Sequence, residues 1–245
     1  MALFCPLLAT IGGLGEQIRS RFGQQVIGMA NIEIERLKKV FRTAGGEKFV
    51  ALHDINLTIE DGEFVAVVGT SGGGKTTLLN IIAGLTPPTE GEIRVGGRVI
   101  SGPGRDRGVV FQQDSVFLWR TVLRNVEYGM EMAGVPKKER RERAMHCLRI
   151  VGLEKFATFY PKELSGGMKK RVQIATVFAN NPEVLLMDEP FGALDYSTKC
   201  TLQEELLNIL KQEPKTTVFV THDIEEAIYL ADRVVCLKQG TLTRE

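Results

Sequence analysis

The stretch Glu63–Thr76, EFVAVVGTSGGGKT, decides the fold class of this 245-residue chain. Glu63–Val68 is a short, almost continuous apolar run, which is typical of a strand buried on both faces of a sheet. Gly69–Thr76 follows it and fits the pattern G-x-x-x-x-G-K-[ST]. Lys75–Leu85 then has the apolar spacing of a helix. A buried strand, a glycine-rich turn and a helix are the context that this phosphate-binding pattern requires.

The residue types of this segment suit the phosphate chain of a nucleotide. Glycines let the backbone curl so that successive N–H groups point at phosphate oxygens, and the helix N-terminus adds partial positive charge. We expect Lys75 to reach the β- and γ-phosphates and the Thr76 hydroxyl to hold Mg²⁺. The alternative is a glycine-rich turn without a ligand. The residues expected at the nucleotide are Gly69, Thr70, Ser71, Gly72, Gly73, Gly74, Lys75, Thr76 and Thr77.

Two acidic residues end a second apolar run. Val184–Met187 predicts another buried strand, and Asp188 and Glu189 come directly after it. Ligands bind at the carboxyl edge of an open α/β sheet, so both carboxylates are expected there. We assign Asp188 to orienting Mg²⁺ through water and Glu189 to polarising the water that attacks the nucleotide. The alternative is a strand end with two solvated acids.

The remaining apolar runs complete the fold prediction. Thr217–Val220 and Val234–Leu237 are apolar on both faces, which favours a mostly parallel sheet covered by helices. Ile32–Leu37 and Ile55–Ile59 alternate with polar residues and predict half-buried strands. Sequence with helical character fills about 115–180. We therefore expect an α/β domain over 29–245, with an antiparallel β region near its start and a helical insertion.

Composition excludes several other classes of protein. Hydrophobic residues make up 43% and charged residues 25%, which argues against disorder as the dominant state. The 31 basic and 30 acidic residues give a net charge of +1, which does not support nucleic acid as a partner. No stretch approaches the ~18 consecutive apolar residues of a membrane span, so another chain must supply any membrane part. The four cysteines have neither metal-ligand nor disulfide spacing.

A third motif, LSGGM at Leu164–Met168, points to a family. By itself it is a serine cap and a glycine pair at a helix N-terminus, which is either an ordinary cap or an anion site. It lies between Gln112 and Asp188 in the chain, and His222 follows. In this order the motifs resemble those of the ATP-binding subunits of ABC transporters, which have a P-loop NTPase core. The resemblance covers essentially Ile32–Leu237.

The resemblance implies a role for residues that their local pattern leaves open. Gln112, in VVFQQ, corresponds to a glutamine that senses Mg²⁺ and water, and His222, in VTHD, to a histidine that contacts the γ-phosphate. A helix cap is the alternative for His222. Phe41 stands where the family places an aromatic ring on adenine; a core phenylalanine is the alternative, and Phe49 is a rival. The implied catalytic set is Glu189, His222, Lys75 and Gln112, and the implied Mg²⁺ set is Thr76, Gln112 and Asp188.

In the family a second ATPase subunit, identical or a paralogue, closes the nucleotide site. The signature residues Ser165, Gly166 and Gly167 would therefore contact the nucleotide of the partner subunit. Asp195, in ALD, corresponds to the aspartate of the family's D-loop, which the resemblance also places at the nucleotide. The chain would be an ATPase whose cofactors are ATP and Mg²⁺.

Longer segments narrow the resemblance to one group of importers. GPGRDRGVVFQQ, FLWRTVLRNVEYGM and LLMDEPFGALD are similar to the ATPases that import nitrate, sulfonates including taurine, and bicarbonate. Two residues depart from that group, because Leu118 replaces a proline and Thr176 replaces an arginine. These departures leave the assigned catalytic residues untouched but weaken the inference about the solute. Trp119, beside Leu118, is either a hot spot for a partner or a buried core residue.

The resemblance implies permease subunits as direct partners and a periplasmic or lipid-anchored solute-binding protein as an indirect one. The chain would then lie at the cytoplasmic face of the inner membrane as a peripheral subunit. The alternative function is a non-transport ABC ATPase acting on DNA or the ribosome, and a P-loop kinase or nucleotide-binding regulator is more distant. The solute itself is not encoded in this chain.

Residues 1–28 stand apart from the rest of the sequence. Met1–Gly15 carries no charge and has no basic segment before its apolar residues, so it is a poor secretory signal. We expect residues 1–28 to be a dispensable extension or the result of a start assigned upstream of the true one. A segment that docks on a partner or touches a membrane, or an element packed on the domain, is the alternative.

Overall fold

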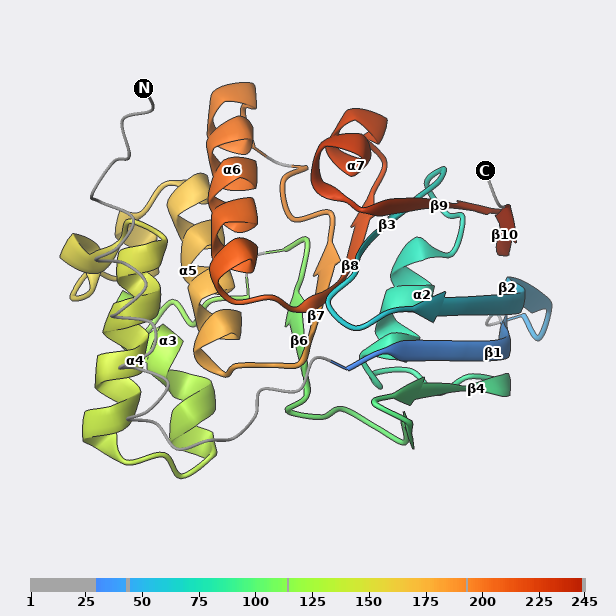
Figure 1. The fold of residues 1–245 in the computed structure, drawn as a ribbon, viewed down its shortest axis with the longest axis horizontal. Coiled ribbons are helices and arrows are strands. Elements are labelled where there is room, and N and C mark those ends of the chain that lie inside the picture. The colour runs from blue at the N-terminus through green and yellow to red at the C-terminus, as the bar shows by residue number, and fades with distance from the viewer. Residues whose placement is uncertain (1–29, 43–44, 114, 193, 244–245) are drawn as a thin grey trace, which may run out of the picture.

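The computed structural model describes residues 30–42, 45–113, 115–192 and 194–243, and within these ranges the chain forms two sheets (Figure 1). The smaller sheet is antiparallel, with the order β2 (Lys48–Ile59), β1 (Ile32–Arg42), β4 (Glu90–Val95), β5 (Arg98–Val99). The larger sheet has the order β10 (Thr241–Thr243), β9 (Arg233–Lys238), β3 (Phe64–Val68), β8 (Thr216–Thr221), β7 (Val184–Asp188), β6 (Arg107–Val110). Its strands are parallel except β10, which pairs antiparallel with β9.

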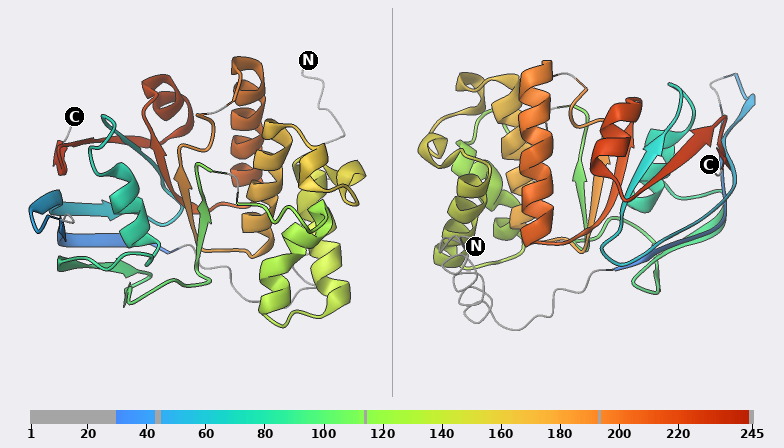
Figure 2. Two further views of the ribbon diagram at one scale, coloured as in Figure 1. Left: turned by 180° about the vertical axis from the view of Figure 1, so that it is seen from behind. Right: turned by 45° about the horizontal axis from the view of Figure 1, so that its top comes forward.

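Helices lie on both faces of the larger sheet, as Figures 1 and 2 show. On one face α2 lies between the two sheets. The helical region that contains α3, α4 and α5 covers the other face, with α6 and α7 beside it. The helices are α2 (Lys75–Ile82), α3 (Val122–Met132), α4 (Lys137–Ile150), α5 (Gly166–Ala179), α6 (Tyr196–Gln212) and α7 (Ile224–Leu230), with short 3₁₀ turns at Glu154–Phe156 and Pro161–Glu163.

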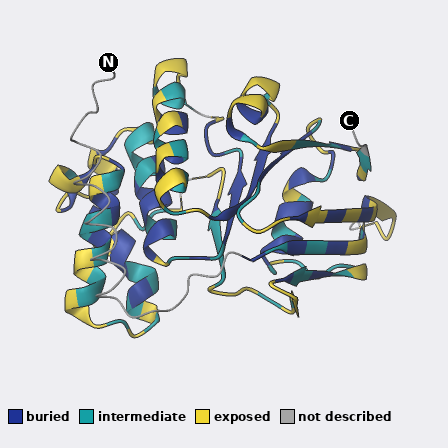
Figure 3. Ribbon diagram, in the orientation of Figure 1, coloured by how far each residue is buried: buried dark blue, intermediate teal, exposed yellow. Residues whose placement is uncertain are grey.

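The apolar run of β3 explains why two cores form. Successive side chains of a strand point to opposite faces of the sheet. Phe64, Ala66 and Val68 face the helical region, whereas Val65 and Val67 pack with α2 and the smaller sheet. A strand of this kind must be apolar at every position, and all five residues are buried (Figure 3). The predicted parallel sheet and N-terminal antiparallel region are confirmed.

The helical region forms because its helices present apolar stripes to one another. In α3 the buried side chains include Val122, Val126 and Met130, which recur at helical spacing. The Thr121 side chain caps this helix by accepting a hydrogen bond from the amide of Arg124 at 3.3 Å. The outer surfaces of α4 and α6 are exposed (Figure 3). Helices therefore occupy much of the stretch that the sequence predicted to be helical, about 115–180.

The proposed N-terminal extension, residues 1–28, lies outside the described residues. None of the helices described in the structure has the length and apolar character needed to cross a membrane.

Candidate nucleotide site

The residues that directly follow four parallel strands of the larger sheet, β3, β6, β7 and β8, lie at the same edge of that sheet. In the parallel pairings Val68 aligns with Thr221, Asp188 with Val220 and Val110 with Met187. Because these strands run in the same direction and end together, Gly69, Glu189 and His222 all leave the sheet at its carboxyl edge. Gln112 follows β6 by two residues. This is the edge at which open α/β sheets bind ligands.

The glycines of the phosphate loop are required by the path of the backbone. Gly72 and Gly74 have φ angles of +76° and +99°, in the left-handed region that favours glycine. A Cβ atom on Gly74 would also lie 2.6 Å from the carbonyl oxygen of Ala51, and one on Gly69 would overlap the carbonyl oxygen of Leu237. The loop therefore fits closely between β2 and β9 and leads directly into α2.

Lys75 points back into this loop. Its side chain is buried, and Nζ donates hydrogen bonds to the carbonyl oxygens of Gly69 at 2.9 Å and Thr70 at 3.1 Å. A lysine ammonium has three N–H donors, so one remains for a phosphate oxygen. The N-terminus of α2 adds further positive potential at the same place. The loop thus holds a cation in a fixed position at the start of α2.

Thr76 and Asp188 bring two oxygen ligands together. The Thr76 hydroxyl lies 3.3 Å from Oδ1 of Asp188, and Asp188 is only 7% exposed. Burial raises the pKa of Asp188, and the neighbouring Glu189 charge adds to this, whereas the hydrogen bond from Thr76 and the charge of Lys75 act in the opposite direction. The alternative of two solvated acids is therefore wrong for Asp188.

The donor set at Thr76 and Asp188 fits a hard divalent cation. Mg²⁺ is usually held by one or two carboxylates together with substrate phosphates and water, rather than by a cage of protein ligands. Among the residues that the structure describes, no group of three or more His, Cys, Asp or Glu could hold a metal ion. The Thr76 hydroxyl and the Asp188 carboxylate, beside a phosphate loop, match the arrangement in which Mg²⁺ is held by few protein ligands together with phosphates and water.

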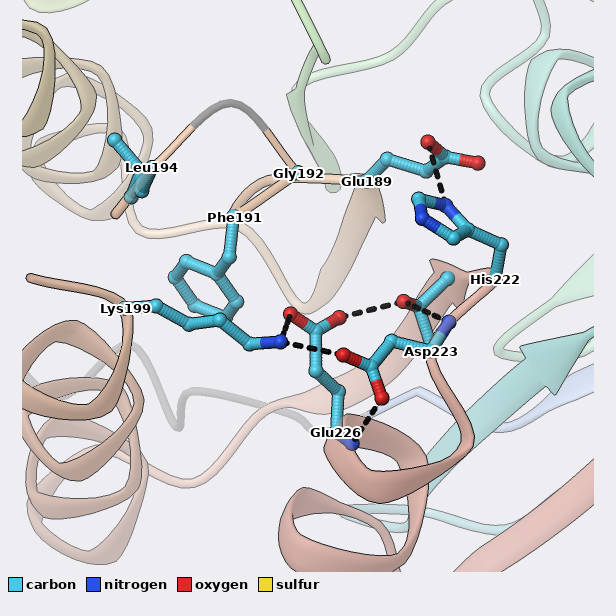
Figure 4. A pocket seen from close by; sticks show the side chains of 9 residues that line it. Glu189, Phe191, Gly192, Leu194, Lys199, His222, Asp223 and Glu226 are labelled. Atoms are coloured by element: carbon cyan, nitrogen blue, oxygen red, sulfur yellow. Dashed lines mark hydrogen bonds and ion pairs between the residues drawn. The ribbon is translucent and has the colours of Figure 1, made fainter. Parts of the chain in front are cut away.

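Glu189 lies between Gln112 and His222. Its Oε2 atom is 3.3 Å from Nε2 of Gln112 and 3.1 Å from Nδ1 of His222, as Figure 4 shows for the histidine. The backbone of Glu189 has a φ of +43°, and its amide donates to the carbonyl oxygen of Val220 at 2.9 Å. A non-glycine residue in this left-handed region is strained, and such strain is concentrated at functional sites.

His222 does not cap the helix that follows it, so that alternative is wrong. Asp223 is the cap of α7, because its Oδ1 accepts hydrogen bonds from the amides of Glu225 at 2.9 Å and Glu226 at 3.3 Å. The side chain of His222 is 61% exposed and faces Glu189 (Figure 4). The ring is therefore accessible to a ligand at the sheet edge.

A partly buried ionic cluster underlies His222 and was not predicted from the sequence. Lys199 of α6 lies 2.5 Å from Asp223 and 2.9 Å from the buried Glu226, which also accepts a hydrogen bond from Thr221 at 2.5 Å (Figure 4). This hydrogen-bonded lysine lowers the pKa of Asp223. The cluster lines a cavity of about 180 Å³ together with Glu189 and His222. Thr221 and Asp223, the residues on either side of His222 in the chain, are both held by contacts within this cluster.

The signature residues lie apart from the phosphate loop of the same chain. Ser165 caps α5 by accepting a hydrogen bond from the amide of Met168 at 3.3 Å. Figures 1 and 2 show α5 and α2 on opposite sides of the larger sheet. Asp195 caps α6 through the amide of Thr198 at 3.1 Å, and the hydrogen bond from Thr198 lowers its pKa. The structure therefore does not bring Ser165 to the phosphate loop of its own chain.

The aromatic residues left open by the sequence are on the surface. Phe41 of β1 and Phe49 of β2 face each other across the strand pair and are 40% and 54% exposed, so the core alternative for Phe41 is wrong. Trp119 is 75% exposed and its neighbour Leu118 is 58% exposed, so the core alternative for Trp119 is also wrong. The Thr176 hydroxyl donates to the carbonyl oxygen of Val172 within α5 at 2.8 Å.

A phosphate loop between a parallel strand and a helix, with a carboxylate pair, a glutamine and a histidine at the same sheet edge, defines a P-loop nucleotide hydrolase. Residues 52–192 match the ABC transporter family, and the chain belongs to this family. It is an ATP-binding cassette ATPase.

Known proteins of this family are similar over most of the chain. The nitrate import ATP-binding protein NrtD of Synechocystis sp. is 51% identical over 217 residues, which are 88% of this chain and 81% of that protein. The taurine import ATP-binding protein TauB of Rhizobium johnstonii is 46% identical over 206 residues, which are 84% of this chain and 79% of that protein. A dimeric ATP-binding cassette solved in a post-hydrolysis state with ADP and Pi superposes with a TM-score of 0.78 at 38% identity, covering 87% of this chain and 97% of that chain.

Proposed function

We propose that this chain is the ATP-hydrolysing subunit of an importer for a small anion such as nitrate, a sulfonate including taurine, or bicarbonate. The observation that carries the catalytic part is the contact of Gln112 and His222 with one oxygen of Glu189, at the sheet edge that holds the phosphate loop. The similarity to import subunits named for nitrate and taurine supports the solute class.

Each residue of the site has a separate function in ATP binding or hydrolysis. Lys75 and the loop amides bind the phosphate chain, and Phe41 stacks on adenine. Glu189 accepts a proton from water as the water oxygen attacks the γ-phosphorus, the bond to the β-phosphate oxygen breaks, and ADP and inorganic phosphate are the products. His222 contacts the γ-phosphate, and Gln112 keeps the carboxylate and the water in line. Thr76, Asp188 and Gln112 would hold Mg²⁺, which when bound neutralises charge on the phosphate oxygens.

A second ATPase subunit completes the site. Ser165, Gly166 and Gly167 form a capped helix N-terminus that suits an anion, yet they lie across the sheet from the phosphate loop of their own chain. In a two-fold dimer each chain offers this helix end to the γ-phosphate of its partner. Asp195 lies in the same subunit contact. The dimeric state of the superposed cassette supports this arrangement.

The membrane part of the importer is supplied by separate permease subunits, with a periplasmic or lipid-anchored solute-binding protein acting through them. The exposed Trp119 and Leu118 follow the Gln112 loop and form a docking surface for the permease. In this proposal the chain is a peripheral subunit at the cytoplasmic face of the inner membrane.

One experiment tests the solute assignment and the coupling together. The chain is purified with the permease and binding protein encoded beside it and reconstituted into vesicles loaded with ATP. We expect uptake of one of nitrate, taurine or bicarbonate, together with stimulated phosphate release. ATP hydrolysis without uptake of any small anion would refute the importer assignment, and absence of hydrolysis by the complex would refute the catalytic assignment.

A further inference from the structure

Two buried side chains of α5 hold the loop that carries Gln112. Nζ of Lys170 donates to the carbonyl oxygens of Phe111 and Gln112, at 3.0 Å in each case. Nε2 of Gln173 lies 3.2 Å from the carbonyl oxygen of Phe111 and 3.3 Å from that of Gln113. The two side chains also bond to each other, from Lys170 to Oε1 of Gln173 at 3.0 Å. Three successive carbonyl groups of the loop are therefore tied to one helix.

These bonds hold a stretch of backbone that belongs to no helix or strand. Residues 111–113 follow β6 and lie outside any helix or strand, so their carbonyl groups need side-chain or water partners. Lys170 is 5% exposed and Gln173 is 2% exposed. Polar groups at this depth are costly unless they are hydrogen-bonded. Gln173 also donates to the hydroxyl of Ser115 at 2.8 Å, which extends the attachment along the loop.

The same helix begins at the signature residues. Ser165 is the cap of α5, and Lys170 and Gln173 lie three residues apart on one face of it. At 1.5 Å per residue, Lys170 lies roughly 7.5 Å along the helix axis from Ser165. A hydrogen-bonded helix moves as a unit over this length. A displacement at Ser165 is therefore carried to the Gln112 loop.

Gln112 is bonded to Lys170 through its carbonyl oxygen, and its side chain faces Oε2 of Glu189 at 3.3 Å. This distance is longer than the most common N–H···O separation, so a small shift of the loop makes or breaks the bond. We propose that Lys170 and Gln173 are positioning residues that transmit displacement of α5 to Gln112 and thereby set its contact with Glu189. The inference rests on the functions proposed above for Gln112 and Glu189.

The first test replaces the donors and measures the steady-state kinetics of the full-length chain. Lys170→Met keeps an unbranched side chain but removes every hydrogen bond of the ammonium. We expect kcat for ATP hydrolysis to fall about tenfold and KM for ATP to change less than about twofold, because the loop contacts Glu189 rather than the phosphate loop. Lys170→Gln retains an N–H₂ donor and should recover most of kcat. Lys155→Met, at an exposed position, is the matched control.

The second test asks whether Lys170 acts through Gln112. The effect of Lys170→Met is measured again in a chain that carries Gln112→Ala, and circular dichroism confirms that each variant is folded. If the two residues form one unit, the second substitution lowers kcat no further. An equal fold loss of kcat in both backgrounds would overturn the proposal, as would wild-type kinetics of Lys170→Met.

A further variant keeps the test decisive if Lys170→Met does not fold. Gln173→Met removes the amide bonds to the loop, and the same cycle with Gln112→Ala is then measured. Wild-type kcat for this variant would overturn the proposal. Wild-type kcat for Gln112→Ala alone would instead refute the function assigned to Gln112, so the two failures are distinguishable.

Discussion

Nδ1 of His222 lies 3.1 Å from Oε2 of Glu189, and the two side chains approach each other from the ends of the neighbouring strands β8 and β7. The contact fixes one oxygen of the carboxylate, Oε2, at the sheet edge that carries the phosphate loop. It also explains why a histidine that does not cap its helix lies at this strand end. Because the proposed function of both residues is to orient the attacking water, each can be tested separately from nucleotide binding.

Replacing Glu189 by glutamine should abolish most hydrolysis without loss of ATP binding. The amide has nearly the same shape but cannot accept a proton from water. We expect phosphate release to fall by about 10² or more, the scale associated with loss of a general base. Binding is measured with a fluorescent ATP analogue and turnover by phosphate release. Glu225→Gln, an exposed acid on α7, is the matched control, and near-normal turnover of Glu189→Gln would disprove the function assigned to Glu189.

Replacing Lys75 by alanine should weaken nucleotide binding itself. The substitution removes the buried cation proposed to bind the phosphates and also releases the carbonyl oxygens of Gly69 and Thr70. We expect the dissociation constant for ATP to rise by about tenfold or more, as for the loss of a charge-assisted hydrogen bond. Titration calorimetry measures this directly, with Lys137→Ala as a control on the exposed surface of α4. Unchanged affinity would contradict the assignment of Lys75.

Asp188→Asn should stabilise the nucleotide-free chain while abolishing hydrolysis. The pKa of Asp188 is raised mainly by burial, so its ionised form costs the folded chain free energy at every pH above the pKa of the unfolded carboxyl. The variant removes this cost, and its Tm should exceed that of the wild type at neutral pH.

The difference in Tm should shrink as the pH falls through the pKa of Asp188, because the wild-type carboxyl is then protonated as well. Thermal unfolding at several pH values without nucleotide measures this dependence. A Tm of Asp188→Asn below that of the wild type at neutral pH would show that the ionised carboxylate stabilises the fold.

Lys199→Met should destabilise the fold, because it leaves the carboxylate of the buried Glu226 without its cation. Lys199 itself is partly exposed, so leaving the Glu226 carboxylate without this partner should cost roughly 1–3 kcal/mol of unfolding free energy. Urea unfolding measures the change, Lys199→Arg should retain most of the stability, and Lys211→Met on the same helix is the exposed control.

The loss caused by Lys199→Met should depend on pH. The hydrogen bond from Lys199 lowers the pKa of Asp223, so this pair stabilises the fold above the usual aspartate pKa and loses that contribution as the pH falls through the folded-state value. The gap between Lys199→Met and the wild type should therefore narrow in acid. A gap independent of pH would mean that Asp223 does not contribute.

The strands whose residues are apolar on both faces could be predicted from the sequence, because a short apolar run between turn residues is typical of a strand buried inside a sheet. β3, β7, β8 and β9 were identified in this way. β6 was not identified, because Arg107–Val110 is short and contains a glycine. That glycine is required by a contact with a distant segment, since a Cβ on Gly108 would collide with the side chain of Pro182. The order of strands in the sheet likewise depends on contacts between distant segments.

The site residues that could be predicted are those that directly follow a buried strand or lie in a glycine-rich motif. Lys170, Gln173 and Lys199 were missed because their partners are backbone groups and carboxylates far away in the sequence. Without the fold, a buried lysine in a helix cannot be told from an exposed one. The same holds for the buried Asn125, whose side chain bonds to the backbone of the loop that presents Trp119.

Trp119→Ala should uncouple ATP hydrolysis from transport without impairing the isolated ATPase. The loop that presents Trp119 is built around the buried Asn125, which accepts from the amide of Phe117 at 2.7 Å and donates to the carbonyl oxygens of Phe117, Arg120 and Thr121 at 3.0–3.1 Å. The indole thus projects from a rigid base, a suitable arrangement for a hot spot.

Loss of such an aromatic anchor typically weakens a complex by about 2 kcal/mol or more, which is a factor of about 30 in affinity. We expect the Trp119→Ala chain to bind detergent-solubilised permease correspondingly less tightly and to lose permease-stimulated hydrolysis, while its basal hydrolysis stays within about twofold of the wild type. Met132→Ala, another exposed apolar residue of the helical region, should change neither. Wild-type affinity of Trp119→Ala for the permease would place the docking surface elsewhere on the chain.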